Sequence, residues 1–176
     1  MTHSDPPPEF SHLVPLSQIG TRPSHLQLLA GEAERKALAR RFGLLSLEAF
    51  TTVVSVVRDG DAIVAEGSIK ADLTQKCVAT NAPVSAKLDE TFAIRFLPEV
   101  SYDSDIEVDL DESDCDTLFH NGRTIDLGEA AAQSLGLAID PYPRIANAAT
   151  ALREAGVKEE HEAGPFAALA KLRKAD

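Results

Sequence analysis

Residues 47–75 read LEAFTTVVSVVRDGDAIVAEGSIKADLTQ, and this stretch decides the fold class. Residues 47–57 are mostly apolar or β-branched, which is typical of a buried strand. The four residues 58–61, RDGD, indicate a hairpin turn with glycine where a positive φ is needed. From residue 62 onward apolar and polar side chains alternate, which predicts a second strand with one solvated face. The segment therefore predicts an antiparallel β-hairpin.

The sequence on either side extends this hairpin into a larger unit. After a turn at 81–83, residues 84–96 alternate again and predict a third strand of a meander. Short strands are expected within 10–19 and 26–30, and a helix over 31–42 that Gly43 ends. Asp126, followed by Glu129 in a capping-box-like arrangement, begins a second helix that reaches about residue 137 and buries Ala131 and Leu135. Beyond Pro141 and Pro143, residues 147–164 read as a linker or weak helix, and 165–174 as a short amphipathic helix.

These elements predict an α+β fold, with an antiparallel β-meander or partly closed sheet, two main helices and a short C-terminal helix. We expect a disordered segment at 1–8 and a single domain over 9–146 that carries an acidic loop at 99–116. Residues 147–176 are expected to form a flexible linker and the short helix.

The formal charge of −11 is concentrated in one place. Residues 99–116 hold 9 acids and no base, whereas 1–98 hold 11 acids and 10 bases and 117–176 hold 8 acids and 7 bases. The body is therefore nearly neutral, and its total charge does not exclude contact with nucleic acid. No long apolar run or secretory signal is present, and Cys77 and Cys115 read as reduced thiols, so we expect a cytoplasmic protein without a membrane contact.

The sequence contains no assembled metal or catalytic motif. Cys77-Val78-Ala79-Thr80 has the spacing of a zinc knuckle, but a threonine hydroxyl is not a structural zinc ligand. The acids at 103–111 superficially resemble a calcium loop but lack its glycine and its final glutamate, so a strand with one charged edge is the simpler interpretation. Nucleotide-binding, nucleophile-elbow and zincin motifs are absent. We therefore expect no cofactor, no metal and no enzymatic activity.

Two groups of charged residues remain as candidate binding sites. A basic group, Arg35, Lys36, Arg40 and Arg41, either contacts phosphates or simply complements the end of its helix. The acidic group could instead capture a basic protein, because complementary charge accelerates association; its members are Asp105, Glu107, Asp109 and Asp111.

Five blocks of sequence occur in an order that resembles a known family. They are LAGEAERKALARRFGL at 29–44, GSIKADLTQKCVAT at 67–80 followed by Pro83-Val84, IDLGE at 125–129, DPYPR at 140–144 and PFAAL at 165–169. Together they resemble the YceD family, the large ribosomal RNA subunit accumulation proteins, of the alphaproteobacterial type, over roughly residues 9–174. The block at 75–80 is its most specific part. Many relatives have CxRC there and a further cysteine after the prolines, where this chain has Thr80 and Arg144, so the resemblance implies that any metal or redox role is lost.

The resemblance implies a non-enzymatic role in accumulation or processing of large-subunit (23S) rRNA, and thus in ribosome biogenesis. The expected partner is that rRNA or a pre-50S particle, contacted directly or through a basic ribosomal protein. Two alternatives remain open: a metal-dependent RNA-processing hydrolase that uses carboxylates of the acidic loop, and an adaptor that binds through its C-terminal helix. The residues that we assign to RNA or partner contact are Arg35, Lys36, Arg40, Arg41, Gln75, Lys76, Cys77 and Thr80.

Overall fold

The computed structural model of the chain describes residues 8–99 and 116–157. Its internal contacts divide the chain into two compact units. The first unit comprises residues 1–75 and 85–140, and the second comprises residues 76–84 and 141–176. Each unit is described separately below.

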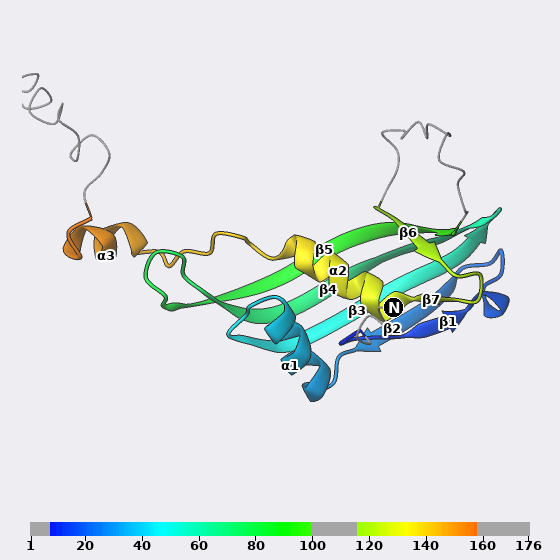
Figure 1. The fold of residues 1–176 in the computed structure, drawn as a ribbon, viewed down its shortest axis with the longest axis horizontal. Coiled ribbons are helices and arrows are strands. Elements are labelled where there is room, and N and C mark those ends of the chain that lie inside the picture. Colours follow the sequence, from blue (N-terminus) through cyan, green and yellow to red (C-terminus); the bar gives the residue numbers. More distant parts are fainter. Residues whose placement is uncertain (1–7, 100–115, 158–176) are drawn as a thin grey trace, which may run out of the picture. The chain divides into compact units, whose positions relative to one another are not determined.

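A five-stranded sheet forms the body of the first unit (Figure 1). The strand order is β2-β3-β4-β5-β6, with antiparallel pairing of β2 to β3 and of β3 to β4, and parallel pairing of β5 to β6. The strands are β2 (Ser24–Leu29), β3 (Ser46–Asp59), β4 (Ala62–Lys76), β5 (Pro83–Pro98) and β6 (Asp116–His120). A separate antiparallel pair joins β1 (Leu13–Pro15) to β7 (Thr124–Asp126), and a single 3₁₀ turn, Leu16–Gln18, follows β1.

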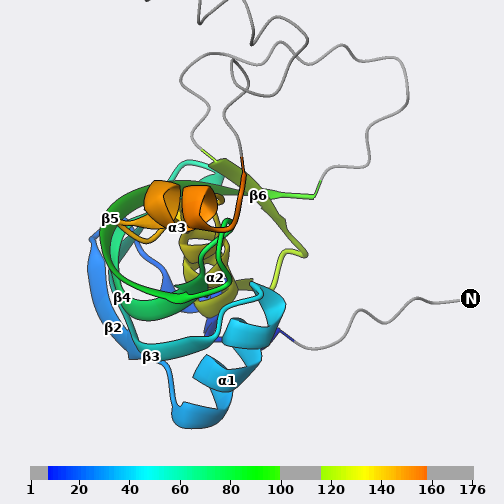
Figure 2. The same ribbon diagram turned by 90° about the vertical axis from the view of Figure 1, so that its left-hand side faces the viewer.

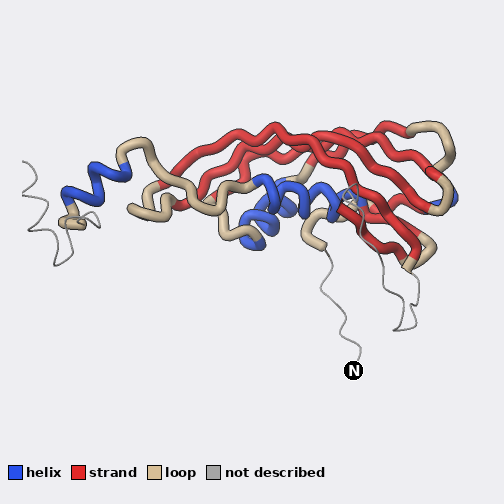
Figure 3. Tube along the Cα trace, turned by 90° about the horizontal axis from the view of Figure 1, so that it is seen from above, coloured by secondary structure: helices blue, strands red, loops and turns tan. Residues whose placement is uncertain are grey.

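The sheet is curved, and helix α2 (Leu127–Ala138) lies on its concave side (Figures 2 and 3). Alternation along β4 turns Ile63, Ala65 and Ile69 inward, all of them fully buried. From α2, a row of small residues and two leucines faces them, which lets the helix approach the sheet closely. These helix residues are Leu127, Ala130, Ala131, Ala132 and Leu135.

Local sequence explains where the two helices of the first unit begin and end. Helix α1 (Glu32–Arg41) follows Gly31, whose N–H donates to Glu34 Oε2 (2.6 Å), and Gly43 takes a φ of +65° after its end. Helix α2 begins at the N-cap Asp126, whose side chain accepts hydrogen bonds from the N–H groups of Gly128 and Glu129. The capping-box part of the expectation is not borne out, because the carboxylate of Glu129 pairs with other side chains.

The second unit contains the turn between β4 and β5 and helix α3 (Ala148–Glu154). Cys77 N–H donates to Ala82 O (2.8 Å), and Asn81 N–H donates to Cys77 O (2.9 Å). Asn81 adopts a φ of +59°, a conformation that asparagine tolerates better than most residues. A further backbone bond, from Val78 N–H to Pro143 O (2.9 Å), ties this turn to the proline-rich segment. The turn is thus fixed by three backbone hydrogen bonds.

The structure confirms the α+β class, the meander β3-β4-β5 and helices over the ranges expected for α1 and α2, while the sheet is not closed. Two features were not predicted: the strands β6 and β7, and the parallel pairing of β6 with β5. The expected disorder at 1–8 and the amphipathic helix at 165–174 fall largely or wholly outside the described residues. Among the described residues, no helix has both the length and the apolar character needed to span a membrane.

Candidate RNA- and partner-binding surfaces

Helix α1 has a narrow apolar side. Leu38 and Ala39 are the buried residues of this helix, and Leu38 is completely inaccessible. The four cations assigned from the sequence occupy the remaining sides of the helix. The structure gives them different environments, so they do not act as one patch.

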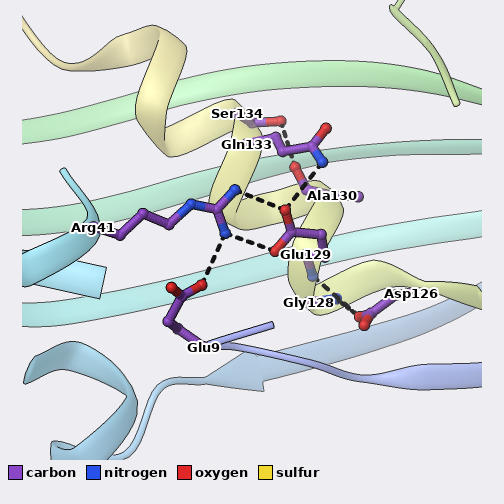
Figure 4. Close-up of polar contacts among 8 residues, drawn as sticks. All are labelled: Glu9, Arg41, Asp126, Gly128, Glu129, Ala130, Gln133 and Ser134. Atoms are coloured by element: carbon purple, nitrogen blue, oxygen red, sulfur yellow. Dashed lines mark hydrogen bonds and ion pairs between the residues drawn. The ribbon is translucent and has the colours of Figure 1, made fainter. Parts of the chain in front are cut away.

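Arg41 is bound within the first unit (Figure 4). Its Nη1 and Nη2 atoms donate to the two carboxylate oxygens of Glu129 on α2, each over 2.8 Å. Nη1 also donates to Glu9 Oε2 (3.0 Å), near the start of the described chain. The hydrogen bonds that Arg41 donates to Glu129, then the charge of Glu129, together with Glu9, raise the pKa of Arg41 further above its ordinary range. Arg41 therefore links α1, α2 and the N-terminal segment.

Glu129 and Asp126 complete this polar cluster at the start of α2 (Figure 4). Hydrogen bonding from Arg41 holds the pKa of Glu129 below its usual value, and Gln133 Nε2 also donates to Glu129 Oε1 (3.0 Å). Asp126 accepts bonds from the amides of Gly128 (3.0 Å) and His12 (2.8 Å). Both carboxylates are therefore held in place by several donors.

Arg35, Lys36 and Arg40 line one groove of about 570 Å³ between α1 and the start of β3. Arg35 Nη1 donates to Ala30 O (2.6 Å), whereas Lys36 pairs with Glu32 (2.6 Å) on the exposed surface. No ion pair within residues 8–99 and 116–157 involves Arg35 or Arg40. The other lining residues are Glu32, Ala39, Leu44, Leu45, Ser46, Leu47 and Glu48. This α1 groove thus combines the guanidinium groups of Arg35 and Arg40 with two acids, Glu32 and Glu48, and several apolar side chains.

The candidates at 75–80 are divided between the two units. Gln75, in the first unit, is 8% exposed and donates from Nε2 to Asp140 O (2.8 Å), so its amide has a structural partner. Lys76 is exposed, and Thr80 is partly buried. Arg144, which belongs to the second unit, is exposed as well. Lys76 and Arg144 therefore present their charges to solvent in the second unit.

Cys77 is a buried thiol within the turn of the second unit. A hydrogen bond from the Thr80 hydroxyl, helped by backbone amides and opposed by burial, lowers the pKa of Cys77 to about 7. Thr80, assigned from the same block of sequence as Cys77, is thus the main interaction partner of that thiol. No cluster of three or more His, Cys, Asp or Glu side chains suited to a metal ion occurs in the part of the chain that the structure describes.

A second groove, of about 410 Å³, was not foreseen from the sequence. It lies where β1, β6, β7 and α2 meet, and its lining includes exposed Leu13 and Phe119 beside Glu99, Asp126 and Glu129. No local signal identifies it, because Leu13, Phe96 and Glu99 join the lining residues of 118–133 only in the folded protein. The acidic candidates Asp105, Glu107, Asp109 and Asp111 lie outside the described residues, as does the C-terminal segment on which the adaptor hypothesis depends.

Comparison with models of protein families gives a match over much of the chain. The family model of the large ribosomal RNA subunit accumulation protein YceD matches residues 65–173, which is more than half of the sequence. The chain belongs to the YceD family. The family's description suggests a role in the accumulation of large-subunit ribosomal RNA. Searches among curated proteins and among solved structures gave no match.

The matched span covers some of the candidate surfaces of this YceD-family protein and not others. It includes β5, α2, the Cys77 turn and the proline-rich segment, whereas α1 and its groove precede it. The most specific block of the resemblance, residues 75–80, therefore lies inside the matched span. The α1 cations, which were assigned from the sequence, lie outside the matched span.

Proposed function

We propose that this protein is a non-enzymatic, cytoplasmic factor that supports accumulation of large-subunit rRNA by contacting the rRNA backbone in a pre-50S particle. The observation that carries the proposal is the charge of the second unit. Its described residues, 76–84 and 141–157, contain three cations, Lys76, Arg144 and Arg153, and one acid, Glu154, in a chain with a net charge of −11. These residues lie inside the span that matches the family.

The Cys77 turn gives this basic region a defined backbone. The bond from Val78 N–H to Pro143 O sets Lys76 and Arg144 on segments that are joined directly. Exposed cations on a fixed backbone lose less conformational freedom on binding a phosphate than cations on a flexible chain would. The α1 groove supplies a further pair, Arg35 and Arg40, in the first unit. Contacts of this kind recognise the phosphate backbone and are independent of sequence.

Charge reversal of each pair tests the proposal. The variants are Lys76→Glu/Arg144→Glu and Arg35→Glu/Arg40→Glu, each compared with the wild type in sedimentation with pre-50S particles and in binding to 23S rRNA fragments. A matched control with the same charge change is Arg22→Glu/Lys87→Glu, because Arg22 and Lys87 are exposed and lie in neither group. Loss of two phosphate contacts should reduce the slope of log K against log salt by roughly 1.4 to 1.8.

The control variant distinguishes site-specific contact from a general loss of positive charge. Depletion of the protein should lower the amount of 23S rRNA, and the control variant should restore that amount while the two site variants should not. Unchanged rRNA binding and full restoration by both site variants would contradict direct backbone contact. An unchanged 23S rRNA pool after depletion would contradict the role itself.

A further inference from the structure

The groove between β1, β6, β7 and α2, which we call the β6 groove, has an apolar surface that is unusually open to solvent. Leu13 is 61% exposed and Phe119 is 60% exposed, and both line it. Beneath them, Phe96 and Ile125 are 3% and 2% exposed and form part of the core. The groove therefore offers two accessible apolar side chains on a firmly packed base, as small anchor sites in protein interfaces do.

The charge around this groove is negative. Its lining includes Glu99, Asp126 and Glu129 and contains neither lysine nor arginine. Asp126 is held by neutral donors, the amides of His12, Gly128 and Glu129 and the hydroxyl of Ser11, so its charge is not neutralised. Arg41 forms ion pairs with both Glu129 and Glu9, so these three side chains together carry a net charge of −1. The surroundings thus favour a cationic occupant and disfavour phosphate.

One acid of the lining, Glu99, is held at the groove by the backbone. Its N–H donates to His120 O (3.0 Å), which fixes the end of β5 beside β6. Glu99 is therefore placed next to Phe119 by a defined contact and adds to the negative charge of the lining.

We propose that the β6 groove binds a basic polypeptide segment that carries an apolar side chain, with Leu13 and Phe119 as the apolar contacts. Phe119 also offers a ring face for a lysine or arginine cation of that segment. This inference rests on the proposed function in one respect: it takes the segment to belong to a ribosomal protein of the assembling large subunit. The chemistry of the site is independent of rRNA contact, because the α1 groove and the Cys77 turn contribute none of its lining residues.

The test uses purified full-length protein and fluorescent peptides. The probe is GKKRFKKLRKG, and its control, GKKRSKKSRKG, has the same charge without the apolar side chains. Fluorescence anisotropy should show roughly tenfold tighter binding of the first peptide, as expected for a single anchor. The variant Leu13→Ser/Phe119→Ser should bind both peptides equally. The matched control Leu29→Ser/Val53→Ser, which replaces side chains 71% and 48% exposed on β2 and β3, should keep the tenfold preference.

A second pair of variants tests the charge without altering the apolar contacts. Glu99→Lys should weaken binding of the probe roughly fivefold, whereas Glu66→Lys on β4 should change it little. Equal peptide preference in the Leu13/Phe119 and Leu29/Val53 variants would overturn the proposal, and so would equal effects of the two lysine substitutions. Binding of a labelled single-stranded RNA oligonucleotide that is lost in Leu13→Ser/Phe119→Ser but kept in Leu29→Ser/Val53→Ser would assign the groove to nucleic acid instead. Because no ribosomal component is present, these outcomes are separate from failure of the rRNA-binding test.

Discussion

Removal of the ion pair between Arg41 and Glu129 should destabilise the first unit, because this contact joins two residues that lie 88 positions apart in the sequence. The perturbation consists of Arg41→Gln, Glu129→Gln and the double variant; Glu129→Gln preserves side-chain length, whereas Arg41→Gln removes the guanidinium and shortens the side chain. Glutamine at 129 can still interact with Gln133, so the change isolates the charged contact. The coupling energy from such a double-mutant cycle measures the pair itself.

The size of the effect follows from geometry and exposure. Two hydrogen bonds of 2.8 Å join the pair, and the side chains of Arg41 and Glu129 are 29% and 20% exposed. Hydrogen bonds to charged groups contribute about 1.5–3 kcal/mol, and exposed ion pairs about 0–1 kcal/mol. For this partly exposed pair we expect each single variant to lose about 2 kcal/mol, with a coupling energy of about 1–1.5 kcal/mol. The melting temperature should fall by roughly 4–8 °C in each single variant.

The same contact predicts how stability depends on pH. The pKa of Glu129 is lower in the folded protein than its ordinary value of 4.5, chiefly because Arg41 donates hydrogen bonds to the carboxylate. The stabilisation is therefore complete above the unfolded-state pKa and is lost as pH falls through the lower folded-state pKa. The wild type should lose more unfolding free energy than Glu129→Gln as the pH is lowered below 4.5. Near neutral pH the difference between them should be constant.

Urea denaturation followed by far-ultraviolet circular dichroism is the suitable assay, because the chain contains no tryptophan. The control cycle is Glu32→Gln with Lys36→Gln, an ion pair of 2.6 Å whose side chains are 74% and 70% exposed. Its coupling should be the smaller of the two, because solvent screens an ion pair on the exposed surface. An Arg41–Glu129 coupling no larger than that of the control, or an equal acid dependence in wild type and Glu129→Gln, would refute the reasoning.

Two further predictions concern single positions. Gly67→Ala should destabilise the sheet by roughly 2 kcal/mol or more in thermal melts, because the new Cβ would lie 2.4 Å from the backbone oxygen of Val53; a melting temperature equal to wild type would contradict this close approach. In a Cys115→Ser background, thiolate absorbance should titrate near pH 7 for Cys77, because the Thr80 hydroxyl stabilises the thiolate. Thr80→Val should move that midpoint upward, and an unchanged midpoint would exclude the hydroxyl as its main cause.

The structure explains why the sequence indicated some of the candidate residues and not others. Lys76, Cys77 and Thr80 were found because they lie in one short block. Gln75 belongs to the same block, but it is a buried partner of Asp140 O. Leu13 and Phe119 carried no signal, since an exposed leucine or phenylalanine is ordinary until its neighbours are known. The contact of Arg41 with two carboxylates was likewise invisible in the sequence.

By itself the sequence determined the α+β class, the β3-β4 hairpin and the start of α2. Each depends on interactions within a few residues: the alternation along β4, the positive φ of Gly60 and the cap at Asp126. Only the tertiary structure decided that Arg41 is bound to Glu129, that β6 runs parallel to β5, and that Leu13 lies beside Phe119 in one groove. The physical reason is that these contacts join distant segments, and packing of the whole chain, not local propensity, brings such segments together.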